Sequence, residues 1–305
     1  MTRRGWLLFA AMCVIWGIPY LLIKVAVADV TPVALVFLRT AMGALLLVPI
    51  AAARGYLKPL QPHWRVLLVY TVVEIAVPWV LLSDAETKLS SSLSGLLVAA
   101  VPLIGAVIAA ALGQERLDLR RLAGLLVGLG GVAALLGLDV GSGDVRAVVE
   151  IGVVAVCYAT GPIIIVRRLS RLPALGVVAV SLAIAAVAYA PAAALQLPRA
   201  MPGGNVLAAI ALLGVVCTAL AFVVFFALIA EVGPVRATVI TYVNPAVAVL
   251  LGVTLLGERF TAGTAAGFVL ILAGCALATR RTRERMPAEE PTPIAMPTPL
   301  EVGGD

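Results

Sequence analysis

The sequence predicts an all-α integral membrane protein with ten transmembrane helices, arranged as two inverted five-helix repeats. Three observations support this fold class. The chain of 305 residues is 62% hydrophobic and 12% charged, whereas soluble domains contain about 25% charged residues. It contains ten long apolar stretches, and a motif from the first half recurs 143 residues later. Together these features favour a duplicated membrane bundle, an architecture typical of transporters whose substrate site lies between the halves.

Each predicted span is long enough to cross a bilayer, which takes about 20 apolar residues in a helix. In chain order the spans cover 6–28, 31–53, 65–83, 92–112, 119–138, 148–167, 173–195, 205–229, 234–256 and 261–280. They are rich in glycine and mostly lack strand-like alternation of apolar and polar residues, so helices are favoured over a barrel. The connections are short. The Pro- and Glu-rich segment 281–305 is predicted to be a disordered cytoplasmic tail.

The repeat aligns without a gap over 102–133 and 245–276, where nine of 32 residue pairs are identical. The recurring residues are Pro102, Glu115, Arg116, Gly124 and Gly131, which return as Pro245, Glu258, Arg259, Gly267 and Gly274. The predicted repeats occupy 1–138 and 139–280. Because each contains an odd number of spans, the second must enter the membrane in the opposite orientation. The same motif on opposite faces cannot be a sided ligand site in both copies, so we expect its Glu-Arg pair to be structural.

The fifth and tenth spans carry signals for their start and for their packing. Asp118 and Thr261 occupy equivalent positions just before these spans, and both residue types are good N-caps. Glycines within the spans offer smooth surfaces for close helix packing. They are Gly124, Gly128, Gly131, Gly267 and Gly274. The same glycine-lined spans are candidates for a homodimer contact.

The distribution of positive charge predicts the orientation in the membrane. The chain has a net charge of +6 and 22 Lys and Arg residues. With the N-terminus in the cytoplasm, inner segments hold 16 of them and outer loops hold four, while Lys24 and Arg39 lie within spans. This bias follows the positive-inside rule. It predicts a multi-pass protein of the bacterial inner membrane with both termini cytoplasmic, and it explains the basic composition without a nucleic-acid partner.

Several short motifs occur in an order that is typical of a known transporter family. They are Trp16-Gly17 with Lys24, Pro32 with Arg39-Thr40, Pro102 with Glu115-Arg116 and Gly124, and Tyr242 with Asn244-Pro245, Glu258-Arg259 and Gly267. Over residues 6–280 this layout resembles the drug/metabolite transporter superfamily, specifically its EamA-like ten-helix members. The resemblance implies a central cavity formed by both halves, alternating access, and export or exchange of small polar or amphipathic metabolites. Glu74 departs from it, because many related sequences have a neutral polar residue there.

Charged residues within the spans are candidates for binding and coupling. Glu74 lies near the middle of the third span, where a charge is costly and usually faces a cavity or a partner. It could exchange a proton between states or bind a substrate amine, or form a static ion pair. Arg39 lies at similar depth and could pair with Glu74 or bind a substrate carboxylate. Lys24 is nearer the end of its span, where it could snorkel to the interface or attract an anionic substrate.

Aromatic residues at mid-depth are candidates for the wall of a cavity. Trp16, Trp79, Tyr158 and Tyr242 lie well inside spans, away from the interfacial positions that such rings usually occupy. Their rings could stack on a substrate or interact with a cation, or they could simply fill the bundle core. Asn244 has an apolar counterpart, so a ligand contact there would break the twofold symmetry.

Two prolines at equivalent positions are candidates for hinges. Pro102 and Pro245 each remove a helix hydrogen bond and free a carbonyl about one turn earlier. The pair could permit bending between transport states, or each could be a fixed kink.

The residues that enzymes need are sparse in this sequence. It has one histidine, His63, in a predicted cytoplasmic loop, and no metal-binding cluster, nucleophile motif or phosphate-binding loop. We therefore expect no enzymatic activity, no cofactor and no metal. The sequence favours a secondary transporter that exports an amino acid-like or aromatic metabolite. Its transport could be coupled to a proton gradient. Sugar-phosphate or nucleotide-sugar exchange and broad drug efflux stay open as alternatives, and a membrane enzyme or scaffold is poorly supported.

Overall fold

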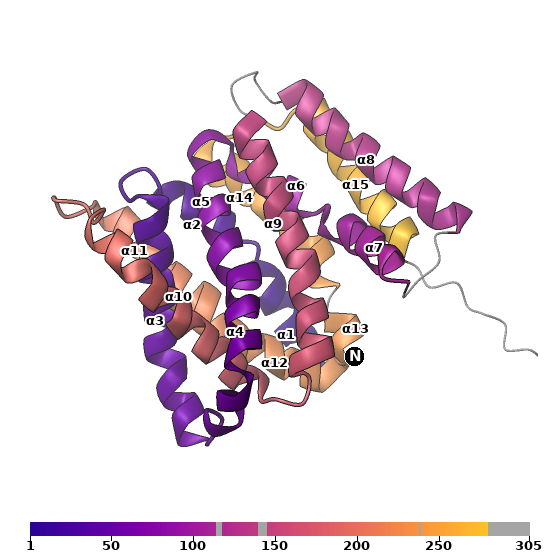
Figure 1. Ribbon diagram of the computed structural model, residues 1–305. Coiled ribbons are helices and arrows are strands. Elements are labelled where there is room, and N and C mark those ends of the chain that lie inside the picture. Colours follow the sequence, from indigo (N-terminus) through magenta and orange to yellow (C-terminus); the bar gives the residue numbers. More distant parts are fainter. Residues whose placement is uncertain (114–117, 140–144, 238, 280–305) are drawn as a thin grey trace, which may run out of the picture.

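The computed structural model describes residues 1–113, 118–139, 145–237 and 239–279. The motif residues Glu115 and Arg116 and the predicted tail 281–305 lie outside this part of the chain. The described residues form helices joined by turns, with no strand (Figure 1). Seven of the helical segments are long and apolar enough to cross a membrane, and Ile240–Leu256 and Ala262–Ala278 are shorter apolar helices. The predicted all-helical membrane fold is confirmed.

The helices of the first half follow the predicted spans in order. They are α1 (Arg3–Ile15), α2 (Pro19–Ala26), α3 (Pro32–Ala53), η1 (Lys58–His63), α4 (Trp64–Thr71), η2 (Val72–Ala76), α5 (Val77–Lys88), α6 (Ser91–Val98), α7 (Val101–Ala111) and α8 (Leu119–Asp139). The third span is longer than predicted. It continues past residue 83 to Lys88, because no glycine or proline stops the helix there.

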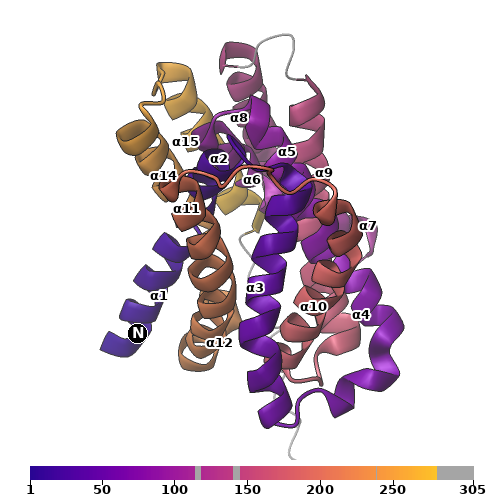
Figure 2. The same ribbon diagram turned by 90° about the vertical axis from the view of Figure 1, so that its left-hand side faces the viewer.

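The helices of the second half also follow the predicted spans in order. Its elements are α9 (Val145–Ile164), η3 (Ile165–Leu169), α10 (Ala174–Ala194), α11 (Gly204–Gly214), η4 (Val215–Leu220), α12 (Ala221–Val232), α13 (Pro234–Ala237), α14 (Ile240–Leu256) and α15 (Ala262–Thr279). The α1 helix packs along α12, as Figure 2 shows. Helices of the two halves therefore interleave in one bundle.

Equivalent helices of the two halves pack against each other in antiparallel fashion. A Cβ built on Gly124 of α8 would meet backbone atoms of Gly274 and Ala278 in α15, whereas one on Gly131 would meet Gly267 and Ile271. The contact thus runs forward along α8 and backward along α15, which lie side by side in Figure 1. This is the relation that an inverted repeat requires. The glycines allow the two backbones to touch directly.

This contact changes the expectation for a homodimer. The glycine faces of α8 and α15 are buried against each other within one chain, so they are not available for a second copy. The prediction of a dimer contact through these two spans therefore loses the observation on which it was based.

The predicted helix starts are confirmed in both halves. The Asp118 carboxylate accepts a hydrogen bond from the backbone N–H of Arg121 at 2.8 Å. The Thr261 hydroxyl accepts one from the backbone N–H of Thr264 at 3.0 Å. Each side chain thereby satisfies a backbone donor that the first turn of its helix leaves without a partner.

The Glu258 carboxylate connects the two halves. After α14, Gly257 adopts a left-handed conformation with φ 67°, which glycine accepts without strain. The chain then turns so that Glu258 accepts hydrogen bonds from the backbone N–H groups of Ser91 at 2.7 Å and Ser92 at 2.9 Å. It also accepts one from the Ser92 hydroxyl. An anion at the N-terminus of α6 is favourable, so the structural role predicted for the Glu-Arg motif holds for Glu258.

Replacing Glu258 with alanine is expected to remove this connection and to destabilise the protein by about 1–3 kcal/mol, because charged hydrogen bonds and a helix cap are lost. Thermal unfolding of the purified protein in detergent would measure the change. Glu258→Gln retains one acceptor oxygen and is expected to fall between the wild type and Glu258→Ala. Equal unfolding midpoints for all three proteins would contradict a stabilising role.

Two π-helical turns interrupt the third and eighth spans at equivalent positions. The η2 turn begins at Val72 and the η4 turn at Val215, which is the same separation of 143 residues that relates the sequence motifs. Glu74 and Cys217 occupy equivalent positions within these turns. A π-helical turn breaks the regular hydrogen-bond ladder and often occurs at a functional site. The duplication thus reaches local backbone geometry that the residue types alone do not show.

Candidate functional site

Arg39 lies at the junction of the two halves. It belongs to α3 and is 8% exposed. Its guanidinium carbon lies 3.7 Å from the centre of the Trp79 ring on α5, and its Nε donates a hydrogen bond to the Thr218 hydroxyl of η4 at 2.8 Å. Stacking on a ring and donation to a hydroxyl are contacts that a planar guanidinium makes well. One cation therefore contacts an aromatic residue of the first half and a hydroxyl of the second.

The η4 turn gives Thr218 its place in this contact. The Thr218 hydroxyl donates to the backbone carbonyl of Leu213, five residues earlier, at 2.8 Å. Its oxygen can then accept from Arg39, so the hydroxyl acts as both donor and acceptor. Thr218 is completely buried. Sequence analysis missed this residue, because a threonine within an apolar span gives no signal until its π-helical turn is known.

Two of the candidate aromatic residues, Trp79 and Tyr158, lie in the core next to this contact. Trp79 is buried in a core with Val178 and Leu182 of α10, and Tyr158 of α9 packs against the same core. Tyr158 also packs against the larger core that contains Tyr20 and is contacted by Tyr242. Tyr158 thus lies between the two main cores, next to the Arg39–Trp79 pair. Tyr242 of α14 packs against the larger core only.

Trp16 contacts a different group of residues from those around Arg39. It follows α1 at the break before α2, and it packs against Phe222 and Phe225 of α12, with ring centroids 6.0 and 4.6 Å away. The adjacent Gly17 lies directly against Val247 of α14. Trp16 therefore belongs to an aromatic group that joins α1 to α12, and this group continues to Phe226.

Glu74 lies in the η2 turn against α9. Its carboxylate fills the space over Gly161, where a Cβ would overlap it. Its Oε2 atom is buried and has no hydrogen-bond partner. The Tyr189 hydroxyl donates to the backbone carbonyl of Ala76 in the same turn at 3.0 Å. The Glu74 carboxyl group thus lies in a π-helical turn, and Gly161 of α9 leaves the space that it occupies.

The predicted pairing of Arg39 with Glu74 is not observed. Among the described residues, the ion pairs do not include one between these two side chains, and Arg39 instead contacts Trp79 and Thr218. The Glu74 carboxyl group therefore packs against α9, whereas the Arg39 guanidinium is hydrogen-bonded to η4. The alternative in which they form one static ion pair is wrong for this conformation.

Lys24 makes contacts that the sequence did not predict. Its Nζ donates hydrogen bonds to the backbone carbonyls of Glu86 at 2.7 Å and Leu89 at 2.8 Å. These carbonyls belong to the C-terminal end of α5, where a cation is favourable. Lys24 therefore holds α2 to α5, and its attraction of an anionic substrate stays a prediction.

The two predicted hinge prolines occupy different positions in their helices. Pro102 is near the start of α7, after a break at Ala99 and Ala100, where its missing N–H breaks no helical hydrogen bond. Pro245 is buried inside α14, next to Asn244. Pro102 therefore lies at a helix break and Pro245 within a continuous helix, and the hinge role stays a prediction for both. The first half has a break where the second has a continuous helix.

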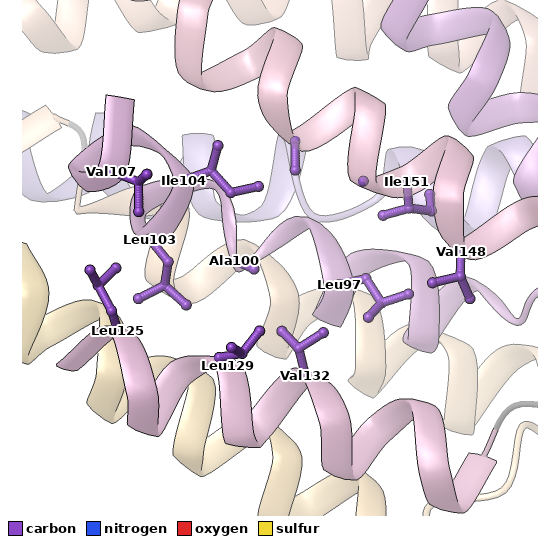
Figure 3. Close-up of a pocket in the computed structure, with 12 residues that line it drawn as sticks. Leu97, Ala100, Leu103, Ile104, Val107, Leu125, Leu129, Val132, Val148 and Ile151 are labelled. Atoms are coloured by element: carbon purple, nitrogen blue, oxygen red, sulfur yellow. The ribbon is translucent and has the colours of Figure 1, made fainter. Parts of the chain in front are cut away.

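A pocket of about 360 Å³ is lined by none of the candidate site residues named above (Figure 3). Its walls are apolar side chains of α6, α7, α8 and α9. They are Leu97, Ala100, Leu103, Ile104, Val107, Leu125, Leu129, Val132, Val148, Ile151, Gly152 and Ala155. Such a lining has no side-chain group to hydrogen-bond a polar solute. The pocket is therefore unsuited to the polar groups of a metabolite, and the cluster around Arg39 is the better candidate site.

Comparisons with known proteins agree with this arrangement. The family model described as EamA-like transporter family matches residues 3–137 and again residues 147–280. The uncharacterized transporter YvbV of Bacillus subtilis is 24% identical, with 94% of this chain and 95% of that protein covered. The uncharacterized inner membrane transporter YedA of Escherichia coli K12 is 28% identical, with 82% of each covered.

A solved crystal structure whose title names no function has the same fold. Its TM-score is 0.65 and its sequence is 24% identical, with 92% of this chain and 97% of that chain covered. The family model matches nearly all described residues, once in each half, and the relatives are named as transporters. The chain belongs to the EamA-like transporter family.

Proposed function

We propose that this protein is a secondary active transporter that exports a small amino acid-like or aromatic metabolite by alternating access. The observation that carries the proposal is the contact of Arg39 with both halves, through Trp79 and through Thr218. If the halves move relative to each other, this contact must break or re-form. A substrate carboxylate could then replace Thr218 as the partner of the guanidinium, and its apolar part could stack on Trp79 and Tyr158.

The remaining predicted residues have supporting roles in this proposal. Tyr242 and Asn244 of α14 would contribute from the second half, Tyr242 packs against the core that Tyr158 also contacts, and Trp16 joins α1 to α12. The units that move are the proposed repeats 1–138 and 139–280, with both termini in the cytoplasm. Exchange of a sugar phosphate would need several free cations near the site. Of the two cations in the spans, Lys24 holds backbone carbonyls and Arg39 stacks on a ring, which favours a substrate with a single carboxylate.

Glu74 is the proposed coupling residue. A buried carboxyl group without a partner for Oε2 is much more stable when it carries a proton than when it is charged. Rearrangement at the irregular η2 turn would bring it to water, where it can lose the proton. Outward movement of substrate could then be driven by inward movement of a proton.

Flux measurements in proteoliposomes test this proposal. Radiolabelled amino acids, with the aromatic ones first, are expected to show counterflow and to accumulate in response to a proton gradient. Glu74→Gln mimics the protonated residue, so it is expected to abolish proton-driven accumulation and to leave counterflow within about twofold. Glu150→Gln is the control, because that carboxylate pairs with Arg146 at the end of α9.

Two outcomes would count against the proposal. Proton-driven accumulation by Glu74→Gln at the wild-type rate would remove the coupling role. A wild-type protein that exchanges none of the amino acids but exchanges a sugar phosphate would favour the alternative substrate class.

A further inference from the structure

Glu86 is a second buried carboxyl group, and the predicted third span ended before it. It lies in the last turn of α5 and has no exposed surface. Both of its carboxylate oxygens are buried without a hydrogen-bond partner. A charged carboxylate in such a position would cost far more free energy than the fold could offset, so the group should be neutral or become paired.

The charged groups around Glu86 are engaged elsewhere. Lys24 of α2 donates to the backbone carbonyls of Glu86 and Leu89 and not to the carboxylate. Arg39 of α3 contacts Trp79 and Thr218, and Glu258 is bound to the start of α6.

The Tyr20 hydroxyl of α2 also lies near Glu86, and Lys88 lies two residues further along α5. The neighbouring acidic groups of α5 and α9 are paired. Arg146 of α9 binds Asp84 of α5 at 2.8 Å and Glu150 at 2.7 Å. The described residues contain no group of three side chains suited to a metal ion. A proton is therefore the ligand that fits the carboxyl group of Glu86.

We propose that Glu86 is a proton-binding site with Lys24 as its switch. In the conformation described, the carboxyl group holds the proton and Lys24 holds the end of α5. When the O–H bond breaks and the proton leaves to water, the carboxylate attracts the Lys24 ammonium. Lys24 then releases the two backbone carbonyls and forms an ion pair. Since Nζ already lies 2.7 Å from the backbone oxygen of the same residue, this exchange needs only a local movement.

The exchange would change how α2 is held against the connection between α5 and α6. That connection is also where Glu258 of the second half binds Ser91 and Ser92. Proton loss at Glu86 would therefore loosen one of the two attachments at this end of the bundle. Its use in transport rests on the proposed function, but proton binding itself does not.

Infrared spectroscopy of the purified full chain in lipid tests proton binding without any substrate. A protonated carboxyl group has a carbonyl stretching band that a carboxylate lacks. We expect one component of this band to be absent in Glu86→Gln at neutral pH and to disappear from the wild type as the pH is raised. Asp84→Asn, changed two residues away on the same helix, is the control and should keep the component. Glu74→Gln identifies the separate contribution of Glu74.

Lys24→Met provides a second and independent measurement. Without the ammonium, the carboxylate has no cation to stabilise it, so the Glu86 band should persist to a higher pH than in the wild type. The proposal is overturned if Glu86→Gln has the wild-type spectrum at every pH, or if the component never titrates. It is also overturned if Lys24→Met does not alter the titration. Absence of flux would refute the proposed function and leave these spectra unaffected.

Discussion

Replacing Gly274 with alanine is expected to lower the midpoint of thermal unfolding by about 6–12 °C. The added Cβ would overlap backbone atoms of Gly128 and Gly124 in α8. A backbone cannot move aside as a flexible side chain can, so α8 and α15 must separate along their contact. Overpacking typically costs about 1–3 kcal/mol and occasionally more, and the clash with backbone puts this change at about 3 kcal/mol. Each kcal/mol corresponds to about 2–4 °C for a domain of 150–250 residues. Differential scanning fluorimetry of the purified protein in detergent would measure the shift.

Gly130→Ala is the matched control for this experiment. Gly130 also lies within α8, but a Cβ there would meet nothing within 4 Å. This change should leave the midpoint unchanged or raise it slightly, because alanine favours the helix more than glycine does. If Gly274→Ala and Gly130→Ala unfold at the same temperature, the close contact between α8 and α15 does not stabilise the protein.

The fold was predictable because lipid imposes strong constraints on sequence. A span must be apolar for nearly its whole length. Because the sequence is duplicated, the spans predicted in one half could be checked against those in the other. Asp118 and Thr261 could be recognised as caps because capping depends on the residue type and on its position just before a helix. The glycines predicted close packing, but composition could not say which helix would meet them. The antiparallel contact of α8 with α15 gives that answer.

The site was predictable only in part, because its contacts depend on backbone irregularity. Trp79 and Arg39 could be selected by residue type and depth, but their contact with each other depends on how α3 packs on α5. Thr218 acquires its role from the η4 turn, whose sequence looks like any apolar helix. Glu86 was missed because polar residues in the last turns of α5 resemble a loop. Glu86 is buried because other helices pack against it, and the sequence around Glu86 does not indicate that packing.

Replacing Arg39 with methionine is expected to weaken substrate binding by about 10–100-fold. Methionine preserves most of the side-chain volume but removes the charge and the hydrogen-bond donors. A hydrogen bond to a charged group contributes about 1.5–3 kcal/mol, and every 1.4 kcal/mol is about a tenfold change in affinity. Arg39→Lys keeps the charge without the planar guanidinium, so it should lose about tenfold. Calorimetric titration with the amino acid that shows counterflow would measure these affinities.

The same variants separate a binding role for Arg39 from a structural one. Thr218 keeps its hydrogen bond to Leu213 when Arg39 is replaced, so no buried hydroxyl is left without a partner and the unfolding midpoint should fall by only a few degrees, about 2–4 °C. Arg146→Met, which removes an exposed cation at the end of α9, should leave affinity unchanged. A large fall in the midpoint with unchanged affinity in Arg39→Met would mean that the guanidinium only holds the halves together. A loss of affinity without such a fall would place it on the substrate.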